Sequence, residues 1–487
     1  MQQNAFARVD TLRFHFNELR QLLVLSALVI LPLPVVLAEP TDIPTNATYY
    51  VSSSKGDDQA DGRSTQTAWR TLARVNVAAF QPGDTILFER GNLWRGQLQA
   101  RSGAVGRPVI YGAYGNGDKP ILQGSVAKDT PDDWLKGGNN LWATRPSASE
   151  PLDEDVGNII FDQGAVCGVK KWRREDLRQN GDYWFDRTNQ QVWLYADTPP
   201  TTQHHSIELA LKKNIVAEEG CHYVTYEDLH LRYGAAHGIG DGYTSHITVR
   251  SCDICFIGGG LQLIRPDGTP VRFGNGIEFW RAAQHNLVEH CRLWEIYDAA
   301  LTDQGIGTNS EQVDITYRDN VIWNAEYSFE YWNRPAAARS ENIMFEHNTC
   351  VDAGHGWGHT QRPNPNGRHL MFYDNPAATR GVVVRDNIFC NSTESCLRMD
   401  NDWRADLALD RNLWFQKSGT VFTFLRHNFT AEQLEAYRAA SGFDLHSIIA
   451  EPKFCNADQH DYRLAPGSSG LKWTPNGQPC GAVPSAD

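Results

Sequence analysis

The chain has 487 residues, 41% of them hydrophobic, and a formal net charge of −13. This composition is typical of a folded globular protein and excludes a disordered one. No tract is rich in Lys or Arg, so the sequence predicts no nucleic-acid partner.

The first 38 residues have the pattern of an export signal. Arg8, Arg13 and Arg20 precede an apolar run over residues 21–38, which ends with Val36 and Ala38 at the spacing that a signal peptidase needs. An uncleaved membrane anchor is the alternative, but two prolines and the small residues at the end of the run disfavour it. We expect cleavage near Ala38, a secreted or periplasmic location, and no membrane segment afterwards.

All ten cysteines follow residue 160 and do not have the spacing of a metal site or of a compact disulfide framework. Export to an oxidising compartment permits disulfides. Nearness in sequence makes Cys390/Cys396 and Cys455/Cys480 the candidate pairs, and we expect several other cysteines to be buried thiols.

The remaining chain divides into four predicted segments. Residues 39–150 contain a capping helix within 67–80 and the first coils. Residues 151–215 have short alternating strands typical of a small antiparallel insertion, and residues 216–425 contain a repeat. Residues 426–487 contain a helix, with Thr430 as N-cap, Gln433 three residues later and Gly442 beyond its end, and then a closing segment.

The repeat consists of short strands with alternating apolar residues, each followed by a residue at one fixed place. Asn320, Asn348, Asn387 and Asn412 occupy that place at intervals of 28, 39 and 25 residues, and Cys252 and Cys291 occupy it in two earlier units. Such units with variable insertions predict a solenoid of parallel β-coils. An inward Asn at one corner of successive coils can bond to the coils on either side, so we interpret this column as structural.

This pattern resembles the right-handed parallel β-helix of the pectin-lyase-like superfamily, whose polysaccharide lyases and glycosidases share such asparagine ladders. Segments 49–96 and 448–470 resemble the opening and closing coils of its secreted members. The resemblance predicts an all-β fold, a parallel β-helix with an N-terminal capping helix and a small antiparallel insertion. It does not select one activity, since this scaffold has many.

Three consecutive coils suggest a site when they are aligned beyond their fixed corner. The aligned segments are IYDAALTDQ (296–304), NAEYSFEYW (324–332) and DAGHGWGHT (352–360). In this register Leu301, Phe329 and Trp357 form an inner column, and Asp298 lies beside Glu326, within about 5 Å on the outside. The glycines of the third segment would leave a groove next to these acids.

Paired carboxylates near aromatic rings are what glycoside hydrolysis needs. Asp298 and Glu326 are the central candidates, with Asp303 and Glu330 as alternative acids or sugar ligands. Trp280 and Trp332 are candidate platforms for sugar rings. The structural alternative for each acid is a solvated or ion-paired surface residue.

The stretch 353–370 predicts a loop that folds over the groove. We expect His359 or His355 to shuttle protons, and Arg362, Arg368 and His369 to bind substrate, with the arginines on a carboxylate or sulfate. Loop-stabilising hydrogen bonds are the alternative. On a strand, His355 and His359 lie about 13 Å apart, too far to share one metal ion. In the insertion 264–281, Arg265, Arg272 and Glu278 would line the opposite bank.

Three classes of function are compatible with these residues, and a secreted glycosidase is favoured. A lyase or epimerase acting on uronates, with Ca²⁺ held by the acids, is the second, although Lys417 is the only lysine from residue 215 to 451. A non-catalytic carbohydrate-binding solenoid is the third.

The expected partner is a polysaccharide or oligosaccharide, and the expected state is a monomer. The favoured interpretation requires no metal or cofactor, and Ca²⁺ is the one candidate cofactor of the alternatives. Asp57, Asp58 and Asp61 are more typical of a turn than of a Ca²⁺ loop.

Overall fold

The computed structural model describes residues 46–307, 310–373, 378–402, 406–473 and 477–483. The predicted leader, residues 1–38, lies outside this range. Residues Asn46–Asp487 form one compact unit. Among the described residues, no helix is both long enough and apolar enough to cross a membrane.

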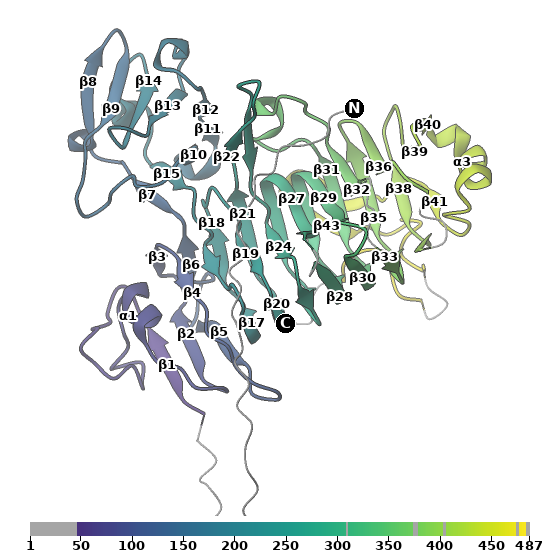
Figure 1. Cartoon of the computed structure of the whole chain (residues 1–487), viewed down its shortest axis with the longest axis horizontal. Helices are drawn as coiled ribbons and strands as arrows, with labels where there is room; N and C mark the ends of the chain where they lie inside the picture. Colours follow the sequence, from purple (N-terminus) through teal and green to yellow (C-terminus); the bar gives the residue numbers. More distant parts are fainter. Residues whose placement is uncertain (1–45, 308–309, 374–377, 403–405, 474–476, 484–487) are drawn as a thin grey trace, which may run out of the picture. The chain divides into compact units, whose positions relative to one another are not determined.

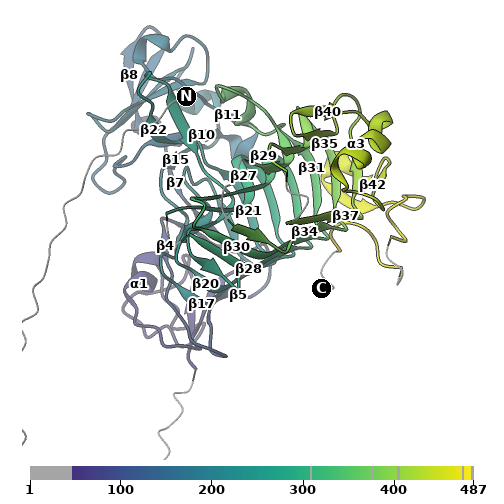
Figure 2. The ribbon, with the colours of Figure 1, turned by 45° about the vertical axis from the view of Figure 1, so that its right-hand side comes forward.

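The unit is built from coils whose strands pair in parallel with those of the next coil (Figure 1). One face is a 12-stranded parallel sheet, and Figure 2 shows several of its strands side by side. Its strands are β1 (Thr48–Val51), β2 (Thr85–Glu89), β5 (Val109–Tyr114), β17 (His222–Glu227), β20 (Ser245–Arg250), β25 (Ala283–Gln284), β26 (Leu287–Glu289), β28 (Glu311–Arg318), β30 (Arg339–Glu346), β33 (Ala378–Arg380), β34 (Val382–Arg385) and β37 (Leu407–Asp410).

An 18-stranded sheet covers the other two faces, because β27 (Arg292–Ile306) and β29 (Val321–Arg334) bend and belong to both. The first of these faces contains β3 (Leu93–Arg95), β6 (Ile121–Gln123), β18 (His230–Arg232), β21 (Asp253–Ile257), β31 (Thr349–Ala353), β35 (Ile388–Ser392), β38 (Leu413–Phe415) and β41 (Ile448–Ile449). The second contains β4 (Leu98–Gln99), β16 (Val216–Ala217), β19 (Ile239–Gly242), β24 (Ile277–Trp280), β32 (Arg368–Phe372), β36 (Ser395–Met399), β39 (Phe422–Phe424) and β40 (His427–Phe429). The predicted all-β parallel β-helix is therefore confirmed.

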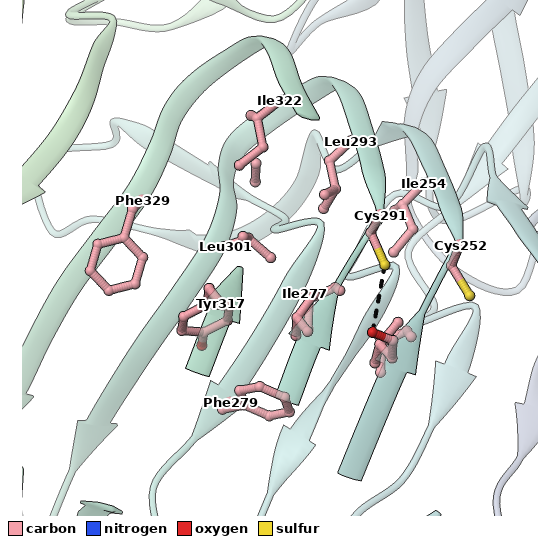
Figure 3. Close-up of a cluster of buried hydrophobic side chains, with 14 of the residues drawn as sticks. Cys252, Ile254, Ile277, Phe279, Cys291, Leu293, Leu301, Tyr317, Ile322 and Phe329 are labelled. Carbon is pink, nitrogen blue, oxygen red and sulfur yellow. Dashed lines mark hydrogen bonds between the residues drawn. The ribbon is translucent and has the colours of Figure 1, made fainter. Parts of the chain in front are cut away.

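The asparagine ladder runs along one corner of the coils as predicted. Asn348 donates from its side-chain amide to the carbonyls of Tyr317 (3.0 Å) and Glu346 (3.1 Å), and its Oδ1 accepts from the Asn320 N–H (3.0 Å). In the earlier coils, the Cys291 thiol donates to the Val249 and Glu289 carbonyls. Cysteine thus takes over the donor role of asparagine, and Figure 3 shows Cys252 and Cys291 among the buried apolar side chains.

One continuous apolar cluster fills the interior of the coils, from Val51 in the first to Trp414 near the last. Strand residues alternate between faces, so the inward residue of each coil packs on that of the next. The predicted capping helix is α1 (Leu72–Val77), whose N-cap Thr71 accepts a hydrogen bond from the Arg74 N–H. Its buried Leu72 and Val75 pack on this cluster.

The predicted insertion begins earlier than residue 151. Strand β7 (Ser125–Ala127) pairs with β15 (Ile207–Leu211), and β8 (Trp134–Gly138) and β9 (Leu141–Thr144) extend the second small sheet. Figure 1 shows this insertion beside the coils. The remaining insertion elements are β10 (Val156–Phe161), β11 (Val166–Cys167), β12 (Val169–Lys170), β13 (Asp182–Asp186), β14 (Gln191–Tyr195) and α2 (Pro200–Gln203).

Two hairpins and a helix lie outside the sheets named so far: β22 (Gly260–Ile264) with β23 (Pro270–Phe273), β42 (Phe454–Asn456) with β43 (Asp461–Leu464), and α3 (Leu434–Ser441). The predicted capping box of Thr430 and Gln433 precedes α3, and Gly442 ends it in the left-handed conformation (φ 75°). All ten cysteines are free thiols, so the candidate pairs Cys390/Cys396 and Cys455/Cys480 are not bonded here.

The ladder predicts a large stability effect for a small substitution. Asn348→Ala removes the side-chain partner of the buried Asn320 N–H and Tyr317 carbonyl, each of which costs about 1–3 kcal/mol when left unpaired, and one donor to the part-buried Glu346 carbonyl. We therefore expect the free energy of unfolding to fall by about 3 kcal/mol or more in denaturant titrations. Asn189→Ala, in an exposed turn, is the matched control. A change for Asn348→Ala as small as that of the control would contradict a structural role for the ladder.

Candidate functional site

Three neighbouring strands, β24, β27 and β29, place polar side chains in columns on their outer side. The register aligns Glu278 with Thr302 and Glu330 in one column, and Trp280 with Gln304 and Trp332 in the next. Between these columns, Phe279 and Tyr331 face inward and belong to the core. Alternation along the strands therefore explains why acids and indoles share one outer surface.

A cavity of about 520 Å³ lies against these columns and is called the acidic cavity below. Its wall includes Trp280 and Trp332, which meet edge to face with ring centroids 5.6 Å apart. Five carboxyl groups also line it, those of Glu219, Asp241, Glu278, Asp298 and Glu330. A second cavity of about 230 Å³ has Tyr297, Tyr327 and Asn366 in its lining. It shares Val271, Arg272, Arg362 and Tyr373 with the acidic cavity.

Glu330 has the most strongly perturbed carboxyl group of the acidic cavity. It accepts a hydrogen bond from the Gln304 amide and another from the Tyr373 hydroxyl, and only 5% of the residue is exposed. Burial, followed by the negative charge of Asp298, holds the pKa of Glu330 well above its ordinary value. This side chain therefore favours the protonated form at the pH where ordinary carboxyls are ionised.

Asp298 occupies a different electrostatic environment in the same cavity. Burial and the charge of Glu326 raise the pKa of Asp298, while the Arg362 guanidinium, 3.1 Å away, opposes this rise. Asp298 thus contacts a fixed cation, whereas Glu330 receives its hydrogen bonds from an amide and a hydroxyl. Of the two carboxyls, Asp298 is the one that the surroundings favour as an anion.

Arg362 joins the loop of residues 354–367 to the coils. Its guanidinium lies 3.1 Å from Asp298 and 3.5 Å from Glu326, and it donates to the Tyr297 carbonyl at 2.7 Å. The rings of Tyr297 and Tyr327 lie against it, 5.0 and 5.7 Å from their centroids. Burial opposes its charge, but the carboxylates of Asp298 and Glu326 outweigh burial and raise the pKa of Arg362.

Glu326 lies beneath this loop and lines neither cavity. Only 2% of it is exposed, and it accepts hydrogen bonds from His359 Nδ1 (2.9 Å) and from the Asn366 N–H (2.7 Å). Asp298 and Glu326 are thus close, as predicted, but Arg362 lies against both. The geometry separates their roles, since Asp298 faces a cavity and Glu326 anchors the loop.

The third coil differs from the predicted alignment. Strand β29 pairs with β32, so that Phe329 lies beside Leu370 and Glu330 beside Met371, and not beside Trp357 and Gly358. The strand before the loop, β31, ends at Ala353, and the next residue, Gly354, has a left-handed φ of 81° that favours glycine. The residues after it leave the sheet, and Trp357 donates from its N–H and its indole to Glu295. The hollow expected from the glycines is therefore covered by the loop.

Three other predicted site residues lie inside the molecule. Asp303 is 0% exposed and accepts a hydrogen bond from the Tyr317 hydroxyl (2.6 Å), because its register places it between inward-facing rings. His369 is also fully buried and bonds to Ser328, and burial lowers its pKa to about 4. Arg368 is 1% exposed and pairs with Glu394. None of the three lines a cavity described above.

The remaining predicted site residues lie either on the wall of the acidic cavity or on the loop of residues 354–367. Trp280 and Trp332 line the acidic cavity, as does Arg272, whose donors bond to the Gly259 and Gly157 carbonyls. His355 is exposed on the loop and lines neither cavity. His359, in a single 3₁₀ turn (His359–Gln361), bonds to Glu326.

Several residues of the site were not singled out from the sequence. Asn275 donates to Glu278 (2.6 Å) and accepts from the Ala299 N–H (2.9 Å), which ties β24 to the segment of Asp298. His237, Gln304 and Tyr373 are further cavity residues. Aligning GIEFW (276–280) with ALTDQ (300–304) places Gln304 in the column of Trp280, so the sequence held a signal for Gln304. No periodicity marks Asn275 or Tyr373.

In the described part of the chain, no group of three or more His, Cys, Asp or Glu residues is arranged to hold a metal ion. Near the N-terminus, Asp58 accepts from the N–H groups of Arg70 and Thr71, and Asp61 from that of Arg63. These carboxylates stabilise turns, as their sequence pattern indicated.

Comparison with known proteins gives one sequence match and several structural ones. No family model matches the chain. A 95-residue stretch is 35% identical to a lacto-N-biosidase of Bifidobacterium longum subsp. longum and spans 18% of this chain and 6% of that protein. Similar solved structures include a glycoside hydrolase (11% identity, 76% of this chain and 88% of that chain, TM-score 0.46) and a pectate lyase (12%, 91% and 97%, TM-score 0.44). The parallel coils themselves confirm the predicted parallel β-helix.

The buried position of Asp303 predicts a pH-dependent stability. Burial raises its pKa from 3.8 to about 7, so the folded protein binds this proton more tightly than the unfolded chain does. Its contribution is therefore lost as pH rises between these two values. Asp303→Asn removes this loss, and we expect it to raise the free energy of unfolding by roughly 2.5 kcal/mol more at about pH 8 than at about pH 5.

Denaturant titrations of both proteins at the two pH values measure this difference. Glu218, whose pKa burial raises to about 8, is present in both and cancels in the comparison. The same pH dependence in both proteins would show that Asp303 is not buried as a neutral acid.

Proposed function

We propose that the protein is a glycoside hydrolase in which Glu330 is the general acid and Asp298 is the ionised partner. The observation that supports this most strongly is the unequal environment of two carboxyls that line one cavity. Retaining and inverting glycosidases both need such a pair, one carboxyl protonated and one ionised. The acidic cavity supplies both beside indole rings.

In this mechanism Glu330 donates its proton to the glycosidic oxygen as the bond to the sugar breaks. Asp298 acts on the opposite side of the sugar, either as the nucleophile or as the base that activates water. Gln304 and Tyr373 hold the Glu330 carboxyl in place, and Arg362, in the wall of the cavity, favours the ionised form of Asp298. Trp280 and Trp332 offer apolar faces on which a sugar ring can stack.

Two further observations favour hydrolysis over elimination. A lyase needs a cation near the uronate carboxyl, but Arg362 contacts two carboxylates and Arg368 is buried against Glu394. The sequence match is to a lacto-N-biosidase, which its name describes as a glycosidase, although the match spans 6% of that protein. The leader-like residues 1–38 support action outside the cytoplasm, on a polysaccharide or oligosaccharide.

Substitution of each acid separately tests these roles. We expect Glu330→Gln and Asp298→Asn to lower kcat/KM by about 10²–10⁴-fold on natural glycans, which is the usual contribution of a positioned acid or base. Aryl glycosides with acidic leaving groups need no proton donor. Glu330→Gln should therefore keep most of its activity on them, while Asp298→Asn should not.

The pH profile gives an independent readout of the same assignment. Wild-type activity should fall on the basic side as Glu330 loses its proton, at a pH well above the ordinary range of a carboxyl, and Glu330→Gln should lack this limb on aryl glycosides. Glu435→Gln, on exposed α3, is the matched control. Full activity of both cavity variants on natural glycans, or an unsaturated product in place of new reducing ends, would contradict the proposal.

A further inference from the structure

The acidic cavity has an excess of negative groups on its wall. Five carboxyls line it, while the basic residues among its described lining are only His237, Arg272 and Arg362. Burial raises the pKa of Asp241, as it does that of Asp298 and Glu330, which indicates how poorly this region solvates added negative charge.

The two guanidiniums of this wall are already engaged by the protein. Arg362 contacts Asp298 and Glu326 and donates to a backbone carbonyl. Arg272 directs its Nε and Nη2 to the carbonyls of Gly259 and Gly157, both at 2.7 Å, and its Nη1 to Gln361 Oε1 at 3.0 Å. A substrate carboxylate would have to displace these partners to gain a bidentate arginine contact.

The imidazole of His237 does not offset the excess of carboxyl groups on the cavity wall. His237 Nδ1 accepts a hydrogen bond from the Asn275 N–H, which is the arrangement of a neutral ring with its proton on Nε2. That Nε2 lies 3.5 Å from Glu278 and so points to a protein carboxylate. The described wall therefore offers acceptors and indole faces to a ligand, and its cationic donors face the protein.

We propose that the acidic cavity selects uncharged sugar units and excludes uronates and sulfated sugars. This inference rests on the proposed function, since it concerns the substrate of the same site. Carboxylates on the wall accept hydrogen bonds from sugar hydroxyls, which all uncharged sugars possess. An anionic group brought within about 6 Å of one unpaired carboxylate is repelled strongly enough to weaken binding at least about tenfold.

Equilibrium binding to the Glu330→Gln variant tests this selection without turnover, because the amide has the size and charge of the protonated acid. The probes are uncharged galacto-, xylo- and N-acetylhexosamine-containing oligosaccharides on one side, and oligogalacturonate and oligoalginate on the other. We expect at least one uncharged probe to bind about tenfold or more tightly than every uronate probe. Binding of neither class, or equal or tighter binding of a uronate, would overturn the inference.

A charge variant separates electrostatic exclusion from exclusion by shape. Glu219 lines the acidic cavity, is exposed, and accepts from the Gly242 N–H at 2.8 Å, which a glutamine oxygen can also do. In the Glu330→Gln background, Glu219→Gln should strengthen uronate binding about two- to fivefold and leave uncharged probes unchanged. Raising NaCl from roughly 10 to 300 mM should also strengthen uronate binding, by screening. Glu175→Gln, on the exposed surface of the insertion, is the control.

Hydrolysis assays with the wild-type protein test the selection of uncharged sugars separately from the proposed glycosidase activity. Release of reducing ends from uncharged probes alone supports both. Hydrolysis of uronates at an equal rate keeps the glycosidase and overturns the selection. Tight binding of uncharged probes without hydrolysis by the wild-type protein keeps the selection and contradicts the glycosidase. Uronate binding that does not respond to salt or to Glu219→Gln would contradict an electrostatic cause.

Discussion

The parallel hydrogen bonds between coils fix which side chains become neighbours across the whole molecule. Each buried asparagine of the ladder bonds to the coils on both sides, so a coil cannot slide without leaving several buried groups unpaired. A shift by one residue would turn Glu278, Glu330 and both indoles inward. The position of the acidic cavity thus depends on a structural column at another corner of the same coils.

Within that frame, Arg362 decides how the acids of the site differ. The Arg362 guanidinium offsets one of the two negative charges of Asp298 and Glu326, which favours the ionised form of Asp298 in this largely buried position. Glu330 contacts neutral donors and keeps its proton more readily. The same arginine, together with His359 and Trp357, fastens the 354–367 loop, so loop closure and the charge of Asp298 are linked. One loop residue therefore contributes to both the shape and the electrostatics of the cavity.

Much of the fold could be predicted from the sequence because its repeat is periodic. Fixed asparagines and alternating apolar residues indicated the coils, and the register of Leu301 with Phe329 and of Thr302 with Glu330 is as predicted. The third coil could not be aligned this way, because its strand ends at Ala353 and the loop of residues 354–367 separates it from β32 (Arg368–Phe372).

The candidate site was harder to predict, since burial and pairing depend on contacts distant in sequence. Alternation gave no support for Asp303 as an acid of the site, because Asp303 follows inward-facing Leu301 by two residues and so lies among inward rings. It also gave no indication that Arg362 would occupy the space between Asp298 and Glu326. The roles assigned to these residues stay predictions, but the structure distinguishes acids that face the cavity from acids that support it.

The most direct measurement of the central claim is a crystal structure of the Glu330→Gln variant with a bound uncharged oligosaccharide. The account predicts a glycosidic oxygen within hydrogen-bonding distance of the side chain at position 330, with Asp298 facing the anomeric carbon of the same sugar and an indole of Trp280 or Trp332 beneath a ring. A sugar bound elsewhere on the molecule, with the acidic cavity empty, would contradict it.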